Sequence, residues 1–269
     1  MRKNYAQLAL LVVLGALAAC GGQTQVTAST VTPDPDIVQV DEDRSGCVIT
    51  APPEELELDP FYVKYCDAQG IPVIASSEVA DEALRQGYYL TLNFFASIPE
   101  IRATMIERGA MLSIYGANQT VRDVPETYTF SLSNSPGAVG LGGSLSQPVT
   151  VTTERDLART PWMCNSVTIH ELGHAIRDIA LLTTVRGFLT QSNDIFALAV
   201  QEDLWAGSYA RTNADEYWAE GVSAYFGAYQ DPYGTSYVRD RESLAEYDPR
   251  LFAFIESIWN GFAWTATCG

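Results

Sequence analysis

The chain contains two histidines, and they lie only four residues apart, at positions 170 and 174. Residues four apart share one face of an α-helix, so a helix here would aim both imidazoles at the same point. The apolar residues around them favour a buried helix over residues 167–182; the alternative is a surface helix that carries this spacing by chance. Because imidazole is a common metal ligand, His170 and His174 are candidate ligands to one metal ion.

Glu171 follows the first histidine and completes the pattern HExxH, which is typical of helices that bind zinc in hydrolases. It lies about 100° around a helix from His170, so it would face a water molecule without competing for the metal. Zinc lowers the pKa of water, and a carboxylate beside that water can take its proton. We therefore expect one zinc ion and a general base, Glu171.

A third protein ligand must be a carboxylate or a cysteine, because the chain has no other histidine. Glu216 and Glu220 lie four apart in a predicted helix over residues 214–228, for which Asn213 is a suitable N-cap. The spacing alone leaves two interpretations, a metal ligand or a solvated helix face. The downstream candidates are Asp178, Asp194, Glu202, Asp203, Asp215, Glu216 and Glu220.

The HExxH pattern is paired with a downstream segment that contains Tyr209, Thr212, Asn213, Glu216, Tyr217, Ala219 and Glu220. Over about residues 78–228 the chain resembles the catalytic domain of anthrax toxin lethal factor and related secreted metallopeptidases of the gluzincin type. The resemblance implies a zincin-like fold, Glu216 as the third zinc ligand, and Tyr209 as the residue that stabilises the oxyanion. The large partner-binding and substrate-docking domains of lethal factor have no counterpart here, so its substrate choice is not implied.

In metal sites, neighbouring hydrogen-bond partners orient the histidine ligands. Two further carboxylates are candidates for this role. Asp178 lies four residues beyond His174, a spacing that resembles the pattern HExxHxxxD of thermolysin-like peptidases. Glu220 is the other candidate. Either residue could instead be a surface carboxylate.

The N-terminus predicts export. Arg2 and Lys3 precede an apolar run over residues 8–17, which is too short for a permanent membrane span. The following sequence Leu-Ala-Ala-Cys resembles the lipobox of bacterial lipoproteins, with Cys20 as the lipid-bearing residue; an ordinary cleaved signal peptide is the alternative. We expect a signal peptide over residues 1–19, a flexible tether over 20–45, and a catalytic domain over 46–269. The expected location is the bacterial cell envelope, with the anchor in the outer membrane or at the cell surface, or release from the cell.

The acidic composition limits the kinds of molecule that the chain is expected to bind. The chain has 16 Lys and Arg against 33 Asp and Glu, a net charge of −17, and loss of residues 1–19 would make it −19. An acidic chain disfavours nucleic acid and anionic lipid, so membrane attachment would depend on the lipid. Four cysteines follow Cys20. In an exported chain they predict two disulfides, and of three pairings we favour Cys47–Cys66 and Cys164–Cys268.

The pattern of the domain predicts an α+β chain with a small sheet upstream of the HExxH helix and a helix-rich C-terminal half. Residues 88–98 favour a helix, although the pattern also fits a strand. The glycine-rich residues 137–143 lack the GxxxxGK pattern of a phosphate loop. Further strands are expected over residues 111–115, 127–132 and 149–153, and further helices over 99–108, 193–206 and 249–259.

The expected function is that of a zinc-dependent endopeptidase that acts on a peptide or protein substrate. A serine-histidine-aspartate triad is excluded, because both histidines belong to the zinc motif. Two alternatives remain: a surface binding protein on the same scaffold with little turnover, and a zinc hydrolase of non-peptide substrates, since HExxH specifies activated water rather than the bond attacked. The sequence indicates nothing about oligomeric state.

Overall fold

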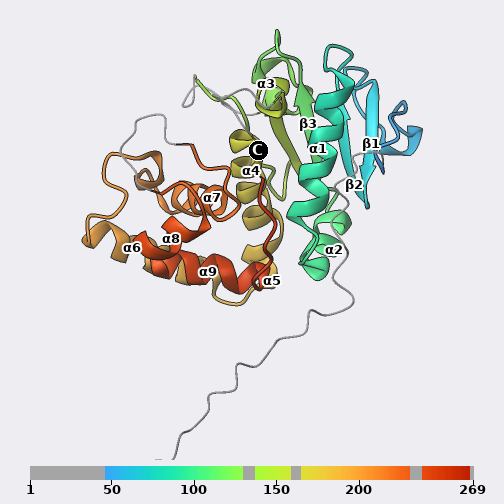
Figure 1. The fold of residues 1–269 in the computed structure, drawn as a ribbon. Coiled ribbons are helices and arrows are strands. Elements are labelled where there is room, and N and C mark those ends of the chain that lie inside the picture. Colours follow the sequence, from blue (N-terminus) through green and yellow to red (C-terminus); the bar gives the residue numbers. More distant parts are fainter. Residues whose placement is uncertain (1–45, 130–136, 159–164, 231–237, 267–269) are drawn as a thin grey trace, which may run out of the picture. The chain divides into compact units, whose positions relative to one another are not determined.

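The first half of the domain contains a four-stranded sheet (Figure 1). The computed structural model describes residues 46–129, 137–158, 165–230 and 238–266. β1 and β2 form an antiparallel hairpin, whereas β2, β3 and β4 are parallel. The strands, in sheet order, are β1 (Lys64–Ala68), β2 (Ile71–Ala75), β3 (Met111–Tyr115) and β4 (Val149–Thr153).

Two helices connect β2 to β3, namely α1 (Asp81–Phe94) and α2 (Pro99–Glu107). α1 packs on one face of the sheet, against β1, β2 and β3 (Figure 1). It approaches closely at Gly87, where a Cβ would lie 2.8 Å from Cδ1 of Ile114. The opposite face carries a smaller apolar cluster that includes Ile74 and Val151. The sheet is therefore buried on both faces, as parallel strands require.

The C-terminal half is helical. α4 packs against both β4 and α7, so it lies between the sheet and the helical half (Figure 1). Trp218 of α7 contacts the rings of Phe188, Phe254 and Trp259, which form an aromatic core behind α7. The helices are α3 (Glu154–Leu157), α4 (Ser166–Ala175), a π-helix (Ile176–Leu181), α5 (Leu182–Thr184), α6 (Phe188–Gln201), α7 (Ala214–Tyr225), α8 (Arg241–Tyr247) and α9 (Pro249–Trp259).

Several expected elements are confirmed. β3, β4 and α9 have the predicted bounds, and the motif helix continues through the π-helix and α5 to Thr184. Residues 88–94 belong to a helix rather than a strand, and α6 begins five residues earlier than expected. The observed α+β composition, with a small sheet before the motif helix, agrees with the predicted class.

The strand predicted over residues 127–132 is wrong at its start, where residues Pro125–Thr129 form a 3-10 helix. The hydroxyl of Thr127 donates to the carbonyl oxygens of Val121 and Val124, at 2.8 Å each, which stabilises the helical turn. Residues 130–132 lie outside the described part. β1 and β2 were not predicted. β2 contains Pro72, which is unusual in a strand interior, but its ladder with β3 begins only at Val73.

The disulfide between Cys47 and Cys66 is present, with 5.4 Å between the Cα atoms. Cys164 and Cys268 lie outside the described residues, as do Cys20 and the predicted signal and tether over residues 1–45. Asn165 follows Cys164 in the sequence and Ala266 lies two residues before Cys268, and the Asn165 amide donates to the Ala266 carbonyl at 2.7 Å. The second pairing stays a prediction.

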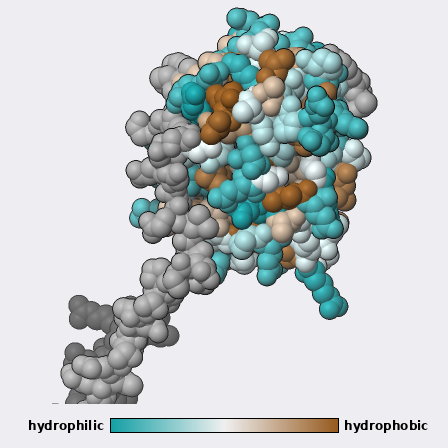
Figure 2. All heavy atoms as spheres, turned by 90° about the vertical axis from the view of Figure 1, so that its right-hand side faces the viewer, coloured by the Kyte–Doolittle hydropathy of each residue, from teal (hydrophilic) through white to brown (hydrophobic). Residues whose placement is uncertain are grey.

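The face that includes the β1 edge is mostly hydrophilic, and its apolar side chains form separate small groups (Figure 2). Thr50 pairs with Tyr65 through two backbone hydrogen bonds, so β1 is partly covered at its outer edge. No helix in the described ranges is long and apolar enough to cross a membrane.

Candidate metal centre

The motif helix α4 begins at a cap supplied from elsewhere in the chain. Asp156 of α3 is fully buried and accepts hydrogen bonds from the backbone N–H of Val167 at 3.2 Å and of Thr168 at 2.8 Å. The Thr168 hydroxyl donates to the same carboxylate at 2.7 Å. Burial raises the pKa of Asp156, while these hydrogen bonds lower it. A carboxylate at this position satisfies the free N–H groups at the helix start and complements its dipole.

Glu216 reaches the histidines from the first turn of α7. The side-chain oxygen of Asn213 accepts from the backbone N–H of Asp215 at 2.8 Å and of Glu216 at 2.9 Å, so the predicted N-cap is present. The indole of Trp218 donates to the carbonyl of Gly173 at 2.8 Å. These bonds fix the start of α7 and its position against α4.

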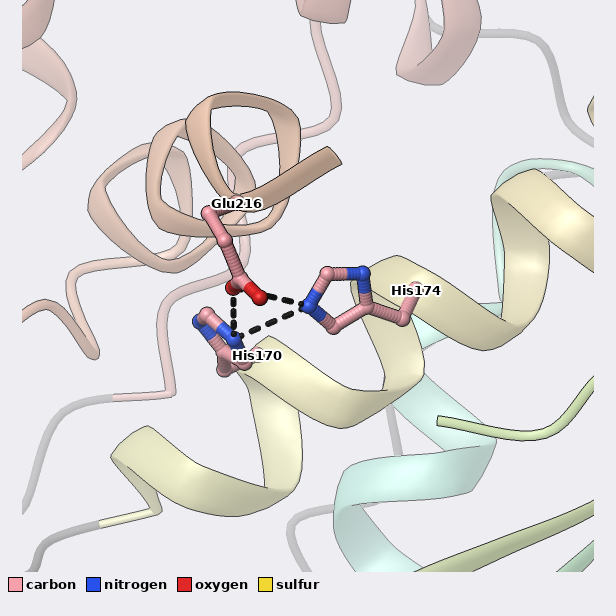
Figure 3. A group of neighbouring side chains, drawn as sticks. All are labelled: His170, His174 and Glu216. Carbon is pink, nitrogen blue, oxygen red and sulfur yellow. Dashed lines mark hydrogen bonds and ion pairs between the residues drawn. The ribbon is translucent and has the colours of Figure 1, made fainter. Parts of the chain in front are cut away.

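The two imidazoles and the Glu216 carboxylate converge on one point (Figure 3). Nε2 of His170 and Nε2 of His174 are 3.0 Å apart, and each lies 3.1 Å from Oε2 of Glu216. All three residues are partly buried. Among the described residues, these three form a group that could hold a metal ion.

The electrostatics of this group favour a cation. Burial lowers the pKa of His170, but hydrogen bonds with Glu216 and Glu220 outweigh it and raise that pKa to about 10. Burial raises the pKa of Glu216, and the two histidines reverse this and hold it well below its usual range. Both shifts come from the same attraction, between the carboxylate of Glu216 and protonated imidazoles, and a bound cation would supply that positive charge in place of the imidazole proton.

Glu220 contacts the other nitrogen of His170. Its Oε1 lies 2.8 Å from Nδ1, and its side chain is only 12% exposed. Because Glu216 and Glu220 are four apart on α7, one helix face carries both carboxylates. The carboxylate of Glu220 fixes the orientation of the His170 ring and directs Nε2 toward Glu216.

Tyr209 lies beside the same point. It belongs to a short 3-10 helix over Tyr209–Arg211, and its ring centre is 6.0 Å from that of His170. Burial and the nearby Glu216 raise the pKa of its hydroxyl, so the group stays protonated and able to donate. Tyr209 is nonetheless 46% exposed, which leaves it accessible from solvent.

A cleft of about 730 Å³ opens over the site. Glu171, the predicted base, lines it together with His170, His174, Tyr209 and Glu216. Burial raises the pKa of Glu171, the histidines lower it, and the charges of Glu216 and Glu220 raise it. The arrangement thus combines three convergent ligand atoms, a carboxylate and a phenol around one open space.

A glycine-rich strap, here defined as residues 138–142, lines the cleft and packs against α4. Leu141 pairs with Val151 of β4 through two backbone hydrogen bonds, at 3.0 and 2.8 Å, which hold the strap against the sheet edge. A Cβ at Gly140 would lie 2.8 Å from Oε1 of Glu171, and a Cβ at Gly142 would overlap the Cβ of His174. Glycine is therefore required where the strap passes over the motif helix.

Asp178 is in the cleft but does not orient a histidine in the way proposed from its spacing. Its carboxylate pairs with Arg177, which is buried and also pairs with Asp215. Two other third-ligand candidates pair with arginines: Glu202 with Arg250 and Asp203 with Arg211. Asp194 is exposed on α6.

Sequence reasoning missed the cap Asp156 and the role of Gly140 and Gly142. The cap lies outside the motif, ten or more residues from the groups that it binds. The two glycines could be noticed in the sequence because they lie two residues apart, but this spacing does not indicate what they contact. Comparison of the chain with known proteins gives no further guide, since no protein-family model and no curated protein matches it.

Proposed function

We propose that this protein is a zinc-dependent endopeptidase. The observation that carries the proposal is the convergence of His170, His174 and Glu216 beneath an open cleft, with Glu171 and Tyr209 beside them. Two imidazoles and one carboxylate are the ligand set of gluzincin peptidases, with a fourth position left for water. The resemblance to lethal factor-like metallopeptidases supports the same set and a zincin-like fold.

The donor geometry fits the metal. Donor atoms around a tetrahedral zinc ion are about 3.3 Å apart, because each lies about 2.0 Å from the metal. The three donors here are separated by 3.0 and 3.1 Å, so a small shift would accommodate the ion. When bound, zinc would act as a Lewis acid and lower the pKa of a water molecule toward neutrality.

The residues of the chain divide the remaining work. Glu171 accepts a proton from the attacking water and later gives it to the leaving amine. The Tyr209 hydroxyl donates a hydrogen bond to the oxyanion that forms at the scissile carbonyl. Glu220 holds the His170 ring through Nδ1, which keeps Nε2 free to bind the metal. Asp156 caps the start of α4, and the strap packs against α4 at Glu171 and His174.

We also propose that the protein is exported and held by a lipid on Cys20, on the strength of the N-terminal sequence. The disulfide between Cys47 and Cys66 is compatible with an oxidising compartment. The tether over residues 20–45 would let the domain act away from the membrane surface.

The decisive test is Glu171→Gln, assayed with a mixed peptide library and mass spectrometry of the products. The variant should bind one zinc ion per chain, as the wild type does, and lose at least about a hundredfold in cleavage rate, because general-base catalysis contributes that much. Cleavage at the wild-type rate would contradict the mechanism. Wild-type protein that binds zinc and cleaves no peptide would instead favour a binding protein or a hydrolase of other bonds.

A further inference from the structure

The cleft follows one face of the motif helix for a considerable length. Its lining residues on α4 and the π-helix recur every three or four positions: Ser166, Val167, His170, Glu171, His174 and Asp178. The twelve steps from first to last span about 18 Å, the length of about five residues of extended peptide. The cleft therefore has two ends, on either side of the metal centre.

The two ends differ in charge. α7 runs antiparallel to α4, because Asp215 contacts Arg177 while Glu220 contacts His170. The lining residues after Glu220 therefore lie toward the start of α4, and they are uncharged: Ser223, Ala228, Tyr229 and Gln230. The opposite end carries Asp178. Among the residues that the structure describes, none that lines the cleft is a lysine or arginine.

Asp178 is the one carboxylate of the described cleft lining that the metal centre does not use. Glu216 and Glu220 contact the histidines and are 17% and 12% exposed, and Glu171 is the proposed base. The side chain of Asp178 is 34% exposed and, in the described part of the chain, forms no hydrogen bond or ion pair with either histidine. It is thus available to a ligand in the cleft.

Arg177 holds this carboxylate in place without neutralising its surroundings. The guanidinium is buried and contacts one oxygen of Asp178 and one of Asp215. One positive charge is shared between two negative ones, so the group keeps a net charge of about −1. A fixed carboxylate beside a negative net charge is a suitable partner for a cationic side chain.

We propose that Asp178 is a specificity residue, which binds a lysine or arginine side chain of the peptide substrate at the end of the cleft beyond His174. The proposal rests on the proposed peptidase function and adds the substrate class. A peptide that lies along α4 would place uncharged residues near Ser166 and a basic residue near Asp178. The scissile bond would lie between them, over Glu171.

The test is a cleavage profile of full-length zinc-loaded protein on a peptide library. Wild type should enrich Lys and Arg at one position, at a fixed distance from the cleaved bond. A matched pair of peptides with Lys or Gln at that position then measures kcat/KM. Asp178→Asn should lower the ratio for Lys over Gln by about tenfold, because a charge-assisted hydrogen bond is lost. The Gln peptide should be cleaved within about twofold of the wild-type rate.

Asp215→Asn is the matched control. It brings the net charge of the group to zero but leaves the Asp178 carboxylate in the cleft, so the preference for Lys should fall by less than in Asp178→Asn. Asp178→Lys should reverse the preference toward Asp and Glu at the same position.

Three results would overturn the proposal. A wild-type profile without basic enrichment refutes it and leaves the peptidase function intact. An equal loss on Lys and Gln peptides in Asp178→Asn would mean that the residue acts only on structure. Wild-type protein that binds zinc but cleaves no peptide would refute the peptidase function and this inference together.

Discussion

The two walls of the cleft are built in opposite ways. The wall formed by α4 and α7 presents functional side chains, namely two imidazoles and the carboxylates of Glu171, Glu216 and Glu220. The strap of residues 138–142 packs against α4 and contributes backbone to the cleft, with glycine at the points of closest approach. The helical wall therefore depends on the functional groups of its side chains, and the strap depends on glycines, which leave room because they have no side chain.

This difference predicts opposite sensitivities. On the helical wall, removing atoms should abolish chemistry while the fold survives, because the ligands are partly exposed and the core lies behind them. On the strap, adding a single methyl group should disturb both packing and the site, since it has no space. The following variants test this contrast, from the largest expected effect to the smallest.

His174→Ala removes a ligand from the helical wall and should give the largest effect. With two protein ligands left, we expect no stoichiometric zinc after dialysis, measured by elemental analysis, and no peptide cleavage. Asp194→Ala is the matched control, because this exposed carboxylate of α6 was also a candidate ligand. Retention of one zinc ion per chain by His174→Ala would contradict the proposed site.

Gly142→Ala adds a methyl group to the strap, where it would overlap His174. We expect the free energy of unfolding to fall by about 1–3 kcal/mol, as overpacking usually costs, together with weaker zinc binding. Gly137→Ala is the control, because no atom lies within 4 Å of a Cβ at that position. Denaturant unfolding curves that coincide for both variants would remove the contrast between the walls.

Glu220→Gln sharpens the contrast within the helical wall, where Glu216 is the proposed metal ligand and Glu220 contacts Nδ1 of His170. Loss of the charged partner of His170 Nδ1 should weaken zinc binding by about 10- to 100-fold, measured by competition with a chelator. Glu202→Gln, which breaks a remote pair with Arg250, should leave the affinity unchanged. Equal affinities for both variants would assign Glu220 no supporting role.

The fold was predictable where the pattern was local. β3 and β4 are short runs rich in β-branched and other apolar residues, and α9 begins at a proline in its first turn, so their bounds follow from neighbouring residues. The segment at residues 127–129 was misread, because hydrogen bonds from the Thr127 hydroxyl favour a turn that β propensity does not register. β2 was missed, because Pro72 obscures a strand whose ladder with β3 begins after it.

The sequence by itself determined the pairings that helix geometry fixes. His170 and His174 share a face because they are four apart, and Glu216 and Glu220 do so for the same reason. Only the tertiary structure decided which carboxylate meets the histidines, because that depends on how α7 packs on α4. The cap at Asp156, the glycine strap and the pairing of Asp215 with Arg177 beside Asp178 also depend on contacts between distant segments. Such contacts are set by burial and close packing, which one-dimensional spacing does not encode.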